Sequence, residues 1–223
     1  MSYILNIDTA VTTASVCVSN GNETAAFLFN PSQKDHAAWL HPAIRQVVSD
    51  AGISLQRLDA IAISAGPGSY TGLRVGMSAA KGLCYALQKP LITINTLQMM
   101  AAAVDDTELT LLCPMIDARR MEVFTAIYDT SLRQIVAPTN MILTETSFSE
   151  VLQVSPVLFF GNGSEKFRTI VHHPNAMFAH VEVTAKHMTA LTLRRFAQND
   201  FDNLAYTEPF YGKEFYLQNV KHC

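Results

Sequence analysis

The sequence predicts an α/β protein built from two lobes, and three observations support this fold class. First, a β-branched apolar run leads through a glycine-rich turn into a helix of small residues, in the segment IAISAGPGSYTGLRVGMSAAKG at 61–82. Second, the order apolar strand, Ile-Asp, polar turn and apolar strand occurs twice, as LNIDTAVTTASVCV and as CPMIDARRMEVFTAI. Third, a chain of 223 residues that is 49% hydrophobic and 16% charged can bury the core of two closely packed lobes.

The first half of the chain is predicted to begin with a three-stranded meander and then to alternate strands and helices. Apolar or alternating runs bounded by turn residues predict strands at 4–7, 14–18, 23–29, 58–65 and 91–94. A helix is expected over 33–51, because its apolar residues recur at helical spacing and Gly52 follows at the position of a C-terminal glycine. Pro42 lies inside it, which predicts a kink or a later start. A second helix is expected over 71–88, and a third opens near Asn95 and Thr96.

The second half repeats the opening hairpin. Strands are expected at 111–116, 122–128 and 156–160, with the second hairpin turn at 118–120. A Gly-Asn-Gly turn follows at 161–163, and two further helical stretches come after it. The last helix, at 185–198, carries Met188, Leu191 and Phe196 on one stripe.

Two lobes that each open with strand, Asp, turn and strand predict a duplicated ribonuclease-H-like fold. Actin-like and sugar-kinase-like ATPases are built in this way, with nucleotide bound between the lobes. We expect one lobe over 1–108 and a second over 109–223, the second ending in a tail rich in Phe and Tyr. Such a fold does not by itself define a function.

Composition excludes several functional classes. A formal net charge of −3 argues against a chain that grips nucleic acid alone, because such binding needs clustered Lys and Arg. The 4 cysteines are scattered without disulfide-like or metal-binding spacing. The N-terminal residues lack the pattern of a signal peptide, and no window is apolar for long enough to span a bilayer. A cytoplasmic protein without a membrane partner is therefore expected.

The turns at the strand ends are the candidate nucleotide-facing elements. They contain Asp8, Thr9, Gly66, Gly68, Asp117 and Arg119. In ATPases of this fold, an aspartate at such a position can hold a metal-bound water, and glycine-rich turns can bind an anion. The structural alternative is that each carboxylate caps its own turn and that the glycines permit a tight reversal. The glycine spacing matches neither a Walker loop nor a dinucleotide fingerprint, so a nucleotide-hydrolysing enzyme is the second hypothesis.

Metal-dependent or nucleophilic catalysis lacks a supporting motif. The 7 histidines include no pair at i, i+4, and no G-x-S-x-G elbow is present. We therefore expect no catalytic residue, no metal and no cofactor. Without metal ligands in a suitable pattern, a peptidase is a weaker alternative than a nucleotide-hydrolysing enzyme.

Three motifs in order carry a resemblance to a known family: ILNIDTA, IAISAGPGSYTGLRVGMSAAKGL and MIDARRMEV. Together they resemble the bacterial TsaB family, also called YeaZ, over most of residues 1–130. The resemblance implies a non-catalytic paralogue of TsaD, the subunit that transfers the threonylcarbamoyl group to adenosine in tRNA. It implies pairing with TsaD and recruitment of the small ATPase TsaE, with tRNA met only through the complex. In the catalytic subunit TsaD, the corresponding segment carries a His-Met-Glu-Gly-His motif. Here residues 95–100 occupy that place and include no metal ligand. The tail at 211–213 departs from the family pattern.

The helix after the glycine turn is the candidate partner surface. Gly72, Gly76, Ala80 and Cys84 recur every fourth residue, while a second face carries small or apolar residues. Glycine inside a helix costs about 1 kcal/mol relative to alanine, which close backbone approach could offset. One face is expected to pack internally and the other to meet a partner helix, as the family resemblance also implies. The residues assigned to this surface are Trp39, Leu40, Gly72, Arg74, Gly76, Met77, Ala80 and Leu83. The same apolar helices predict a homodimer when the partner is absent.

Overall fold

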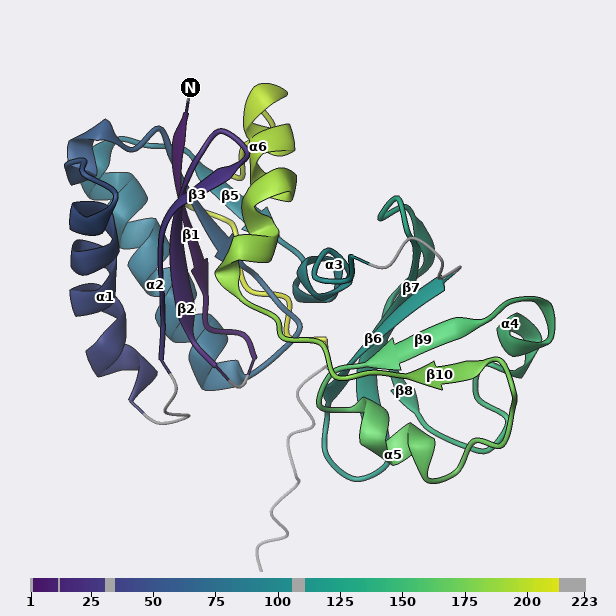
Figure 1. Cartoon of the computed structure of the whole chain (residues 1–223). Helices are drawn as coiled ribbons and strands as arrows, with labels where there is room; N and C mark the ends of the chain where they lie inside the picture. Colours follow the sequence, from purple (N-terminus) through teal and green to yellow (C-terminus); the bar gives the residue numbers. More distant parts are fainter. Residues whose placement is uncertain (1, 12, 31–34, 106–110, 213–223) are drawn as a thin grey trace, which may run out of the picture.

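The structure is a computed structural model that describes residues 2–11, 13–30, 35–105 and 111–212. The described residues form two five-stranded sheets. The two sheets lie in two lobes (Figure 1). No helix in these described ranges is long and apolar enough to cross a membrane.

The first sheet has the strand order β3-β2-β1-β4-β5. The meander consists of β1 (Tyr3–Asp8), β2 (Ser15–Asn20) and β3 (Glu23–Phe29), which pair antiparallel. The strands β4 (Ala60–Ser64) and β5 (Leu91–Ile94) then add parallel to β1. Because β1 and β4 are parallel neighbours, Asp8 and Ser64 lie at the same edge of the sheet.

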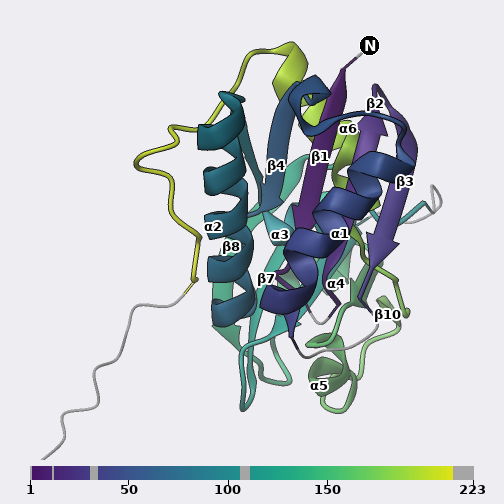
Figure 2. The same ribbon diagram turned by 90° about the vertical axis from the view of Figure 1, so that its left-hand side faces the viewer.

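Two long helices cover one face of this sheet. α1 (His36–Asp50) and α2 (Tyr70–Leu87) pack against each other and bury the residues that alternate along β1, β2 and β4. Figure 2 shows the two helices side by side on the outside of the lobe. Pro42 lies inside α1, six residues after its first residue. The predicted first residue of this helix, residue 33, lies outside the described residues. After α1, a short 3-10 turn, η1 (Leu55–Arg57), leads into β4.

The second sheet has the order β10-β9-β6-β7-β8, which is the connectivity of the first sheet repeated. Its strands are β6 (Leu111–Asp117), β7 (Glu122–Asp129), β8 (Gln134–Ile142), β9 (Val157–Phe160) and β10 (Ala176–Phe178). The first three pair antiparallel, and β9 and β10 continue in parallel. The predicted duplicated ribonuclease-H-like fold, shared with actin-like ATPases, is therefore confirmed.

Short helices complete the second lobe and the junction. α4 (Ser149–Val154) and α5 (Ser164–Arg168) place Leu152 and Phe167 on one face of the second sheet. α3 (Thr96–Ala101) lies between the lobes, because Met99 packs with the first sheet and Met100 with the second. Asn95 caps α3 by accepting from the N–H groups of Leu97 and Gln98, as the sequence predicted.

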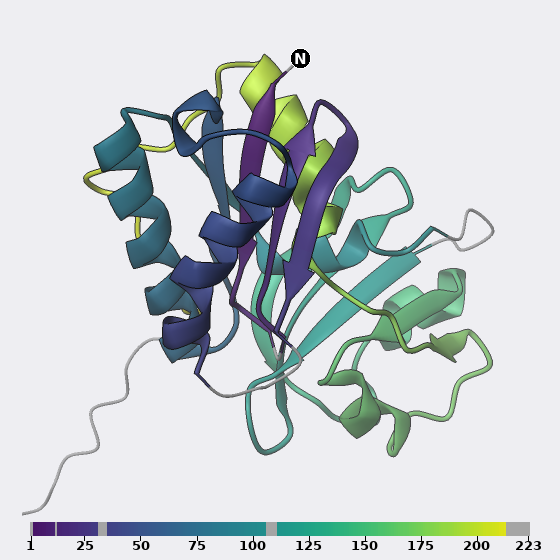
Figure 3. The same ribbon diagram turned by 60° about the vertical axis from the view of Figure 1, so that its left-hand side comes forward.

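The assignment of 109–223 to a single second lobe is corrected by the last helical segment. The 3-10 turn η2 (Ala185–Met188) and α6 (Thr189–Ala197) lie on the first sheet, on the face opposite α1 and α2 (Figure 3). Buried polar contacts hold them there: Thr192 Oγ1 donates to Asn6 Oδ1 at 2.9 Å, and Ala185 N donates to Ser15 Oγ at 2.8 Å. The apolar stripe of α6 thus completes the core of the first lobe rather than that of the second.

Candidate functional site

Asp8 is enclosed at the end of β1. It has no exposed surface, and its Oδ1 accepts from Ser64 Oγ at 2.5 Å and from the N–H of Ala10 at 3.0 Å. Its Oδ2 has no hydrogen-bond partner among the described residues. Burial raises the pKa of Asp8 to about 6, although both hydrogen bonds favour the ionised form. This carboxyl group is therefore held inside the lobe and titrates closer to neutrality than an ordinary aspartate.

The glycine turn after β4 packs directly on the β1–β2 turn. A Cβ atom at Gly68 would meet the carbonyl oxygen of Ala10, and one at Gly72 would meet that of Thr9. The Thr9 hydroxyl, which is fully buried, donates to the carbonyl of Gly72 at 2.8 Å. Glycine is required here because two backbone segments touch.

The N–H groups of that turn are largely engaged inside the chain. Ser69 N donates to the carbonyl of Ala10 at 2.7 Å, Gly66 N to Thr96 Oγ1 at 3.1 Å, and Gly72 N to Ser69 Oγ at 3.3 Å. A phosphate cradle needs such N–H groups directed at the ligand. Of the two alternatives, an anion-binding turn and a tight structural reversal, the tight reversal therefore describes this turn.

Asp117 at the end of β6 is the counterpart of Asp8, but it is exposed. Its Oδ1 accepts from Lys166 Nζ at 2.7 Å and from the N–H of Arg119 at 2.6 Å. The partial burial of Asp117 opposes ionisation, yet Lys166 and Arg119 outweigh it and lower the pKa of this carboxyl group. The backbone N–H of Asp117 also donates to Asn162 Oδ1 at 2.9 Å. Each aspartate thus accepts from the N–H two residues onward, as the turn-capping alternative predicts.

Several partners of this site were not identified from the sequence. Ser64, Asn162 and Lys166 are brought to the two aspartates by parallel strand pairing and by α5. Ser64 is the last residue of β4, two residues before Gly66, and Asn162 lies two residues after β9, between Gly161 and Gly163. The polar residue at a strand end beside such a glycine was the available signal.

The described residues do not contain a group of three or more His, Cys, Asp or Glu placed to hold a metal ion. His187 is used structurally, since its Nδ1 accepts from the N–H of Thr184 at 3.0 Å in the cap of η2. Within residues 95–100, Thr96, Leu97, Met99 and Met100 are buried in the junction helix α3.

The predicted partner residues divide into an internal and an accessible set. Five of them are buried within the chain: Leu40, Gly72, Gly76, Met77 and Ala80. A Cβ at Gly76 would meet the Thr9 hydroxyl and the side chain of Ile63, so the Gly72–Gly76–Ala80 stripe faces the protein's own sheet. This corrects the assignment of that stripe to a partner surface. Arg74 is exposed, and Trp39 and Leu83 are partly exposed.

The outward side of the same helices offers different small residues. Gly82 and Ala86 are exposed, and a Cβ at Gly82 would meet nothing within 4 Å. Arg74 lies over the ring of Tyr70 at 4.0 Å and donates from Nε to the Tyr211 hydroxyl at 3.2 Å. The accessible surface of α1 and α2 is therefore bordered by an organised cation–aromatic cluster.

Comparison with known proteins gives the family. The profile described as TsaD, tRNA N6-adenosine threonylcarbamoyltransferase, matches residues 30–207. The chain belongs to this family. Within the TsaD family it is similar to proteins named TsaB, which confirms the resemblance found in its motifs.

The TsaB relatives differ in how much of their length is matched. The chain is 29% identical over 189 residues to the tRNA threonylcarbamoyladenosine biosynthesis protein TsaB of Bacillus subtilis, covering 82% of this chain and 81% of that protein. It is 37% identical over 127 residues to the TsaB of Escherichia coli, covering 56% of this chain and 54% of that protein. A Pseudomonas aeruginosa protein described as similar to peptidase YEAZ superposes with a TM-score of 0.83 at 24% identity, over 96% of this chain and 100% of that one. This last likeness establishes the fold alone.

Proposed function

We propose that this protein is a non-catalytic subunit in the formation of threonylcarbamoyladenosine in tRNA. In this proposal it pairs with a TsaD-type transferase, and the pair recruits a TsaE-type ATPase. The names of its relatives in Bacillus subtilis and Escherichia coli support the pathway. A net charge of −3 is consistent with tRNA being gripped by the other subunits.

The observation that carries the proposal is the closed turn of the first lobe. A catalytic acid or base must reach the reacting group, directly or through one water. Asp8 has no exposed surface and is bonded to Ser64, while the Thr9 hydroxyl is bonded to Gly72. A nucleotide site would present the Asp8 carboxylate and the Thr9 hydroxyl to its ligand. Here both groups are bonded inside one lobe, which favours an architectural role.

The outer surface of α1 and α2 is the proposed contact with the transferase. Trp39, Leu83 and Gly82 lie on this accessible side, with Arg74 at its border. Gly82 is informative because it costs helix stability and yet has open space around it. A partner helix that approaches closely at Gly82 would account for its presence. A homodimer through the same surface is proposed when the transferase is absent.

The test is light scattering after size-exclusion chromatography, with the protein alone and mixed with the TsaD-type protein of the same organism. A heterodimer is expected. The variant Gly82→Gln should weaken it by about tenfold or more, since bulk at a central close contact removes more than 1 kcal/mol of binding. The matched control Ala197→Gln changes an exposed residue of α6 on the opposite face of the sheet and should pair normally. Folded proteins that do not associate would overturn the proposal, and normal pairing by Gly82→Gln would move the contact elsewhere.

One observation favours the nucleotide-hydrolysing alternative. Asp8 Oδ2 has no hydrogen-bond partner within the described part of the chain, and the pKa of Asp8, about 6, lies in the range of a general base. Steady magnesium-dependent ATP turnover by the purified protein, abolished in Asp8→Asn, would support this alternative. A rate that the substitution does not change would show that Asp8 does not take part in the turnover.

A further inference from the structure

The strand β5 forms one edge of the first sheet. The N–H groups of Ile61 and Ala65 donate to the carbonyls of Pro90 and Ile94, so residues 90, 92 and 94 face β4. The backbone groups of Leu91 and Thr93 therefore point away from the sheet. Such an edge, in an uncharged run of Leu, Ile, Thr and Ile, is a template for pairing with another chain.

The segment that follows α6 covers this edge. We call residues 200–212 the strap. Asp202 N donates to the carbonyl of Leu91 at 2.9 Å, and Thr93 N donates to Asp202 Oδ2 at 2.6 Å. Asp202 thus forms a single antiparallel bridge with Leu91. For the next donor, Thr93 N, the acceptor is the Asp202 carboxylate instead of a backbone carbonyl. A carboxylate satisfies one donor but cannot extend a strand ladder.

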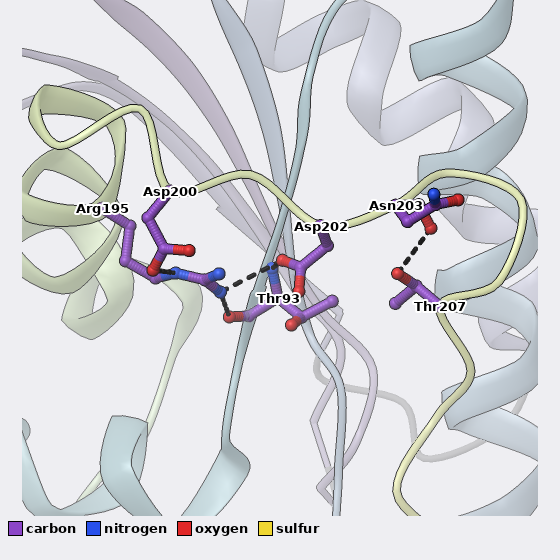
Figure 4. Close-up of polar contacts among 6 residues, drawn as sticks. All are labelled: Thr93, Arg195, Asp200, Asp202, Asn203 and Thr207. Atoms are coloured by element: carbon purple, nitrogen blue, oxygen red, sulfur yellow. Dashed lines mark hydrogen bonds and ion pairs between the residues drawn. The ribbon is translucent and has the colours of Figure 1, made fainter.

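Arg195 of α6 holds the strap in place, as Figure 4 shows. Its Nη1 donates to the carbonyl of Thr93 at 2.5 Å and contacts Asp202 Oδ2 at 3.1 Å. Its Nε contacts Asp200 Oδ2 at 2.7 Å. The side chains of Arg195 and Asp202 are 22% and 21% exposed, whereas that of Asp200 is 55% exposed. One guanidinium therefore joins α6, the edge strand and two strap residues.

The rest of the strap is attached to α2 and to Ala65, the residue after β4. Asn203 Oδ1 accepts from the N–H groups of Ala205 and Tyr206, forming a turn, and Lys81 donates to the carbonyls of Ala205 and Thr207. Phe210 N then donates to the carbonyl of Ala65 at 2.7 Å. In Figure 2 the strap runs along the side of α2 that lies away from α1. The strap therefore does not cross the outer surface between the two helices.

We infer that the strap protects β5 and that the contacts of Arg195 hold the strap on this edge. Loss of these contacts exposes β5 to antiparallel pairing with β5 of a second copy. The occupant is a second copy because two identical edges satisfy each other's outward groups about a two-fold axis. The inference does not depend on the proposed role in tRNA modification, and its test contains no partner protein.

The test compares Arg195→Gln with Arg194→Gln, the same charge change at an exposed neighbour on α6. Both variants are made with Gly82→Gln, so that the proposed association through α1 and α2 is weakened equally in each. Hydrogen exchange of the peptide spanning 89–95 should accelerate by about tenfold or more in Arg195→Gln and not in Arg194→Gln, because local opening governs exchange. As protein concentration rises, exchange of this peptide in Arg195→Gln should slow again while light scattering reports added dimer.

Two results would overturn the inference. Unchanged hydrogen exchange at 89–95 in a folded Arg195→Gln variant would show that Arg195 does not hold the strap on β5. Faster exchange that is independent of concentration, with no added dimer, would show that β5 does not pair with a second copy. If Arg195→Gln is unfolded by circular dichroism, Asp200→Asn replaces it, because it removes only the outer ion pair and should produce the same changes to a smaller degree.

Discussion

The hydroxyl of Ser64 donates a 2.5 Å hydrogen bond to Asp8, and this pair joins the carboxyl ends of β4 and β1 inside the first lobe. The equivalent position of the second lobe is arranged differently. There Asp117 reaches outward to Lys166, and its backbone N–H, rather than its carboxylate, is bonded to Asn162, two residues after the end of β9. Both lobes carry an aspartate at the end of their first strand, but only Asp8 is buried.

The buried carboxyl of Asp8 predicts a pH-dependent stability. Its pKa is about 6 in the folded protein against an ordinary value of 3.8, so between these values the folded state holds a proton that the unfolded state has released. Stability therefore falls as pH rises from about 4 to about 6, and at pH 7 the penalty is about 3 kcal/mol. Asp8→Asn should remove this slope and gain roughly 1–3 kcal/mol at pH 7.5, less the cost of an unpaired amide N–H.

Urea unfolding from pH 4.5 to 7.5 measures the effect of Asp8→Asn. Asp50→Asn, at the exposed C-terminal end of α1, serves as the control and should keep the wild-type slope. A wild-type protein that gains stability through this interval in parallel with Asp8→Asn would contradict the assignment.

Two glycines of α2 should respond oppositely to alanine. Gly72→Ala places a methyl group against the carbonyl oxygen of Thr9, so overpacking should cost about 1–3 kcal/mol. Gly82→Ala meets open space and should gain about 0.5–1 kcal/mol through lower backbone entropy in the unfolded chain. Chemical denaturation of the two variants is the measurement, and equal effects would mean that Gly72 is not held by the β1–β2 turn.

Local patterns were sufficient for most of the first lobe. The strand expected at 23–29 has those bounds, and the meander and the two long helices differ from the prediction by a few residues. By contrast, β8 and β10 were missed. β8 is an edge strand that contains Pro138 and is largely exposed, so it lacks the alternation of a half-buried strand. β10 has only three residues.

The site was harder to predict because its contacts are remote in sequence. Asp8 meets Ser64 across 56 residues, and Thr192 meets Asn6 across 186. The stripe of Gly72, Gly76 and Ala80 was recognised as a close-contact surface, but spacing alone does not distinguish the protein's own sheet from a partner. The position of Thr9 under α2 resolves that question.

The buried cysteines should resist labelling in the folded protein. Burial raises the pKa of the Cys84 and Cys113 thiols to about 12 and also raises that of Cys17. A thiol with a pKa of about 12 is ionised in about one molecule in 10,000 at pH 8, and the thiolate is the reactive form. Because Cys223 lies outside the described residues, the experiment uses Cys223→Ser. Its three cysteines should react with a thiol reagent only as fast as the protein opens, and a rapid stoichiometric reaction at native pH would contradict this account.

The turn between β6 and β7 stores backbone strain in two arginines. Arg119 and Arg120 have φ values of 69° and 48°, in the left-handed region that costs a residue with a side chain about 1 kcal/mol or more. Arg120→Gly should therefore raise stability by about 0.5–1 kcal/mol after the entropy of glycine is counted. Arg120→Lys retains both the charge and the strain and should leave stability unchanged.

Residues held in strained backbone conformations cluster at functional sites, so we expect Arg120 to contribute to the proposed role in tRNA modification. In a reaction reconstituted with the TsaD-type partner, Arg120→Gly should be more stable in thermal denaturation and yet lower the rate of tRNA modification, whereas Arg120→Lys should preserve the rate. Loss of stability in Arg120→Gly would refute the strain itself. A stabilised variant with full activity would instead show that the strained arginine is not required for tRNA modification.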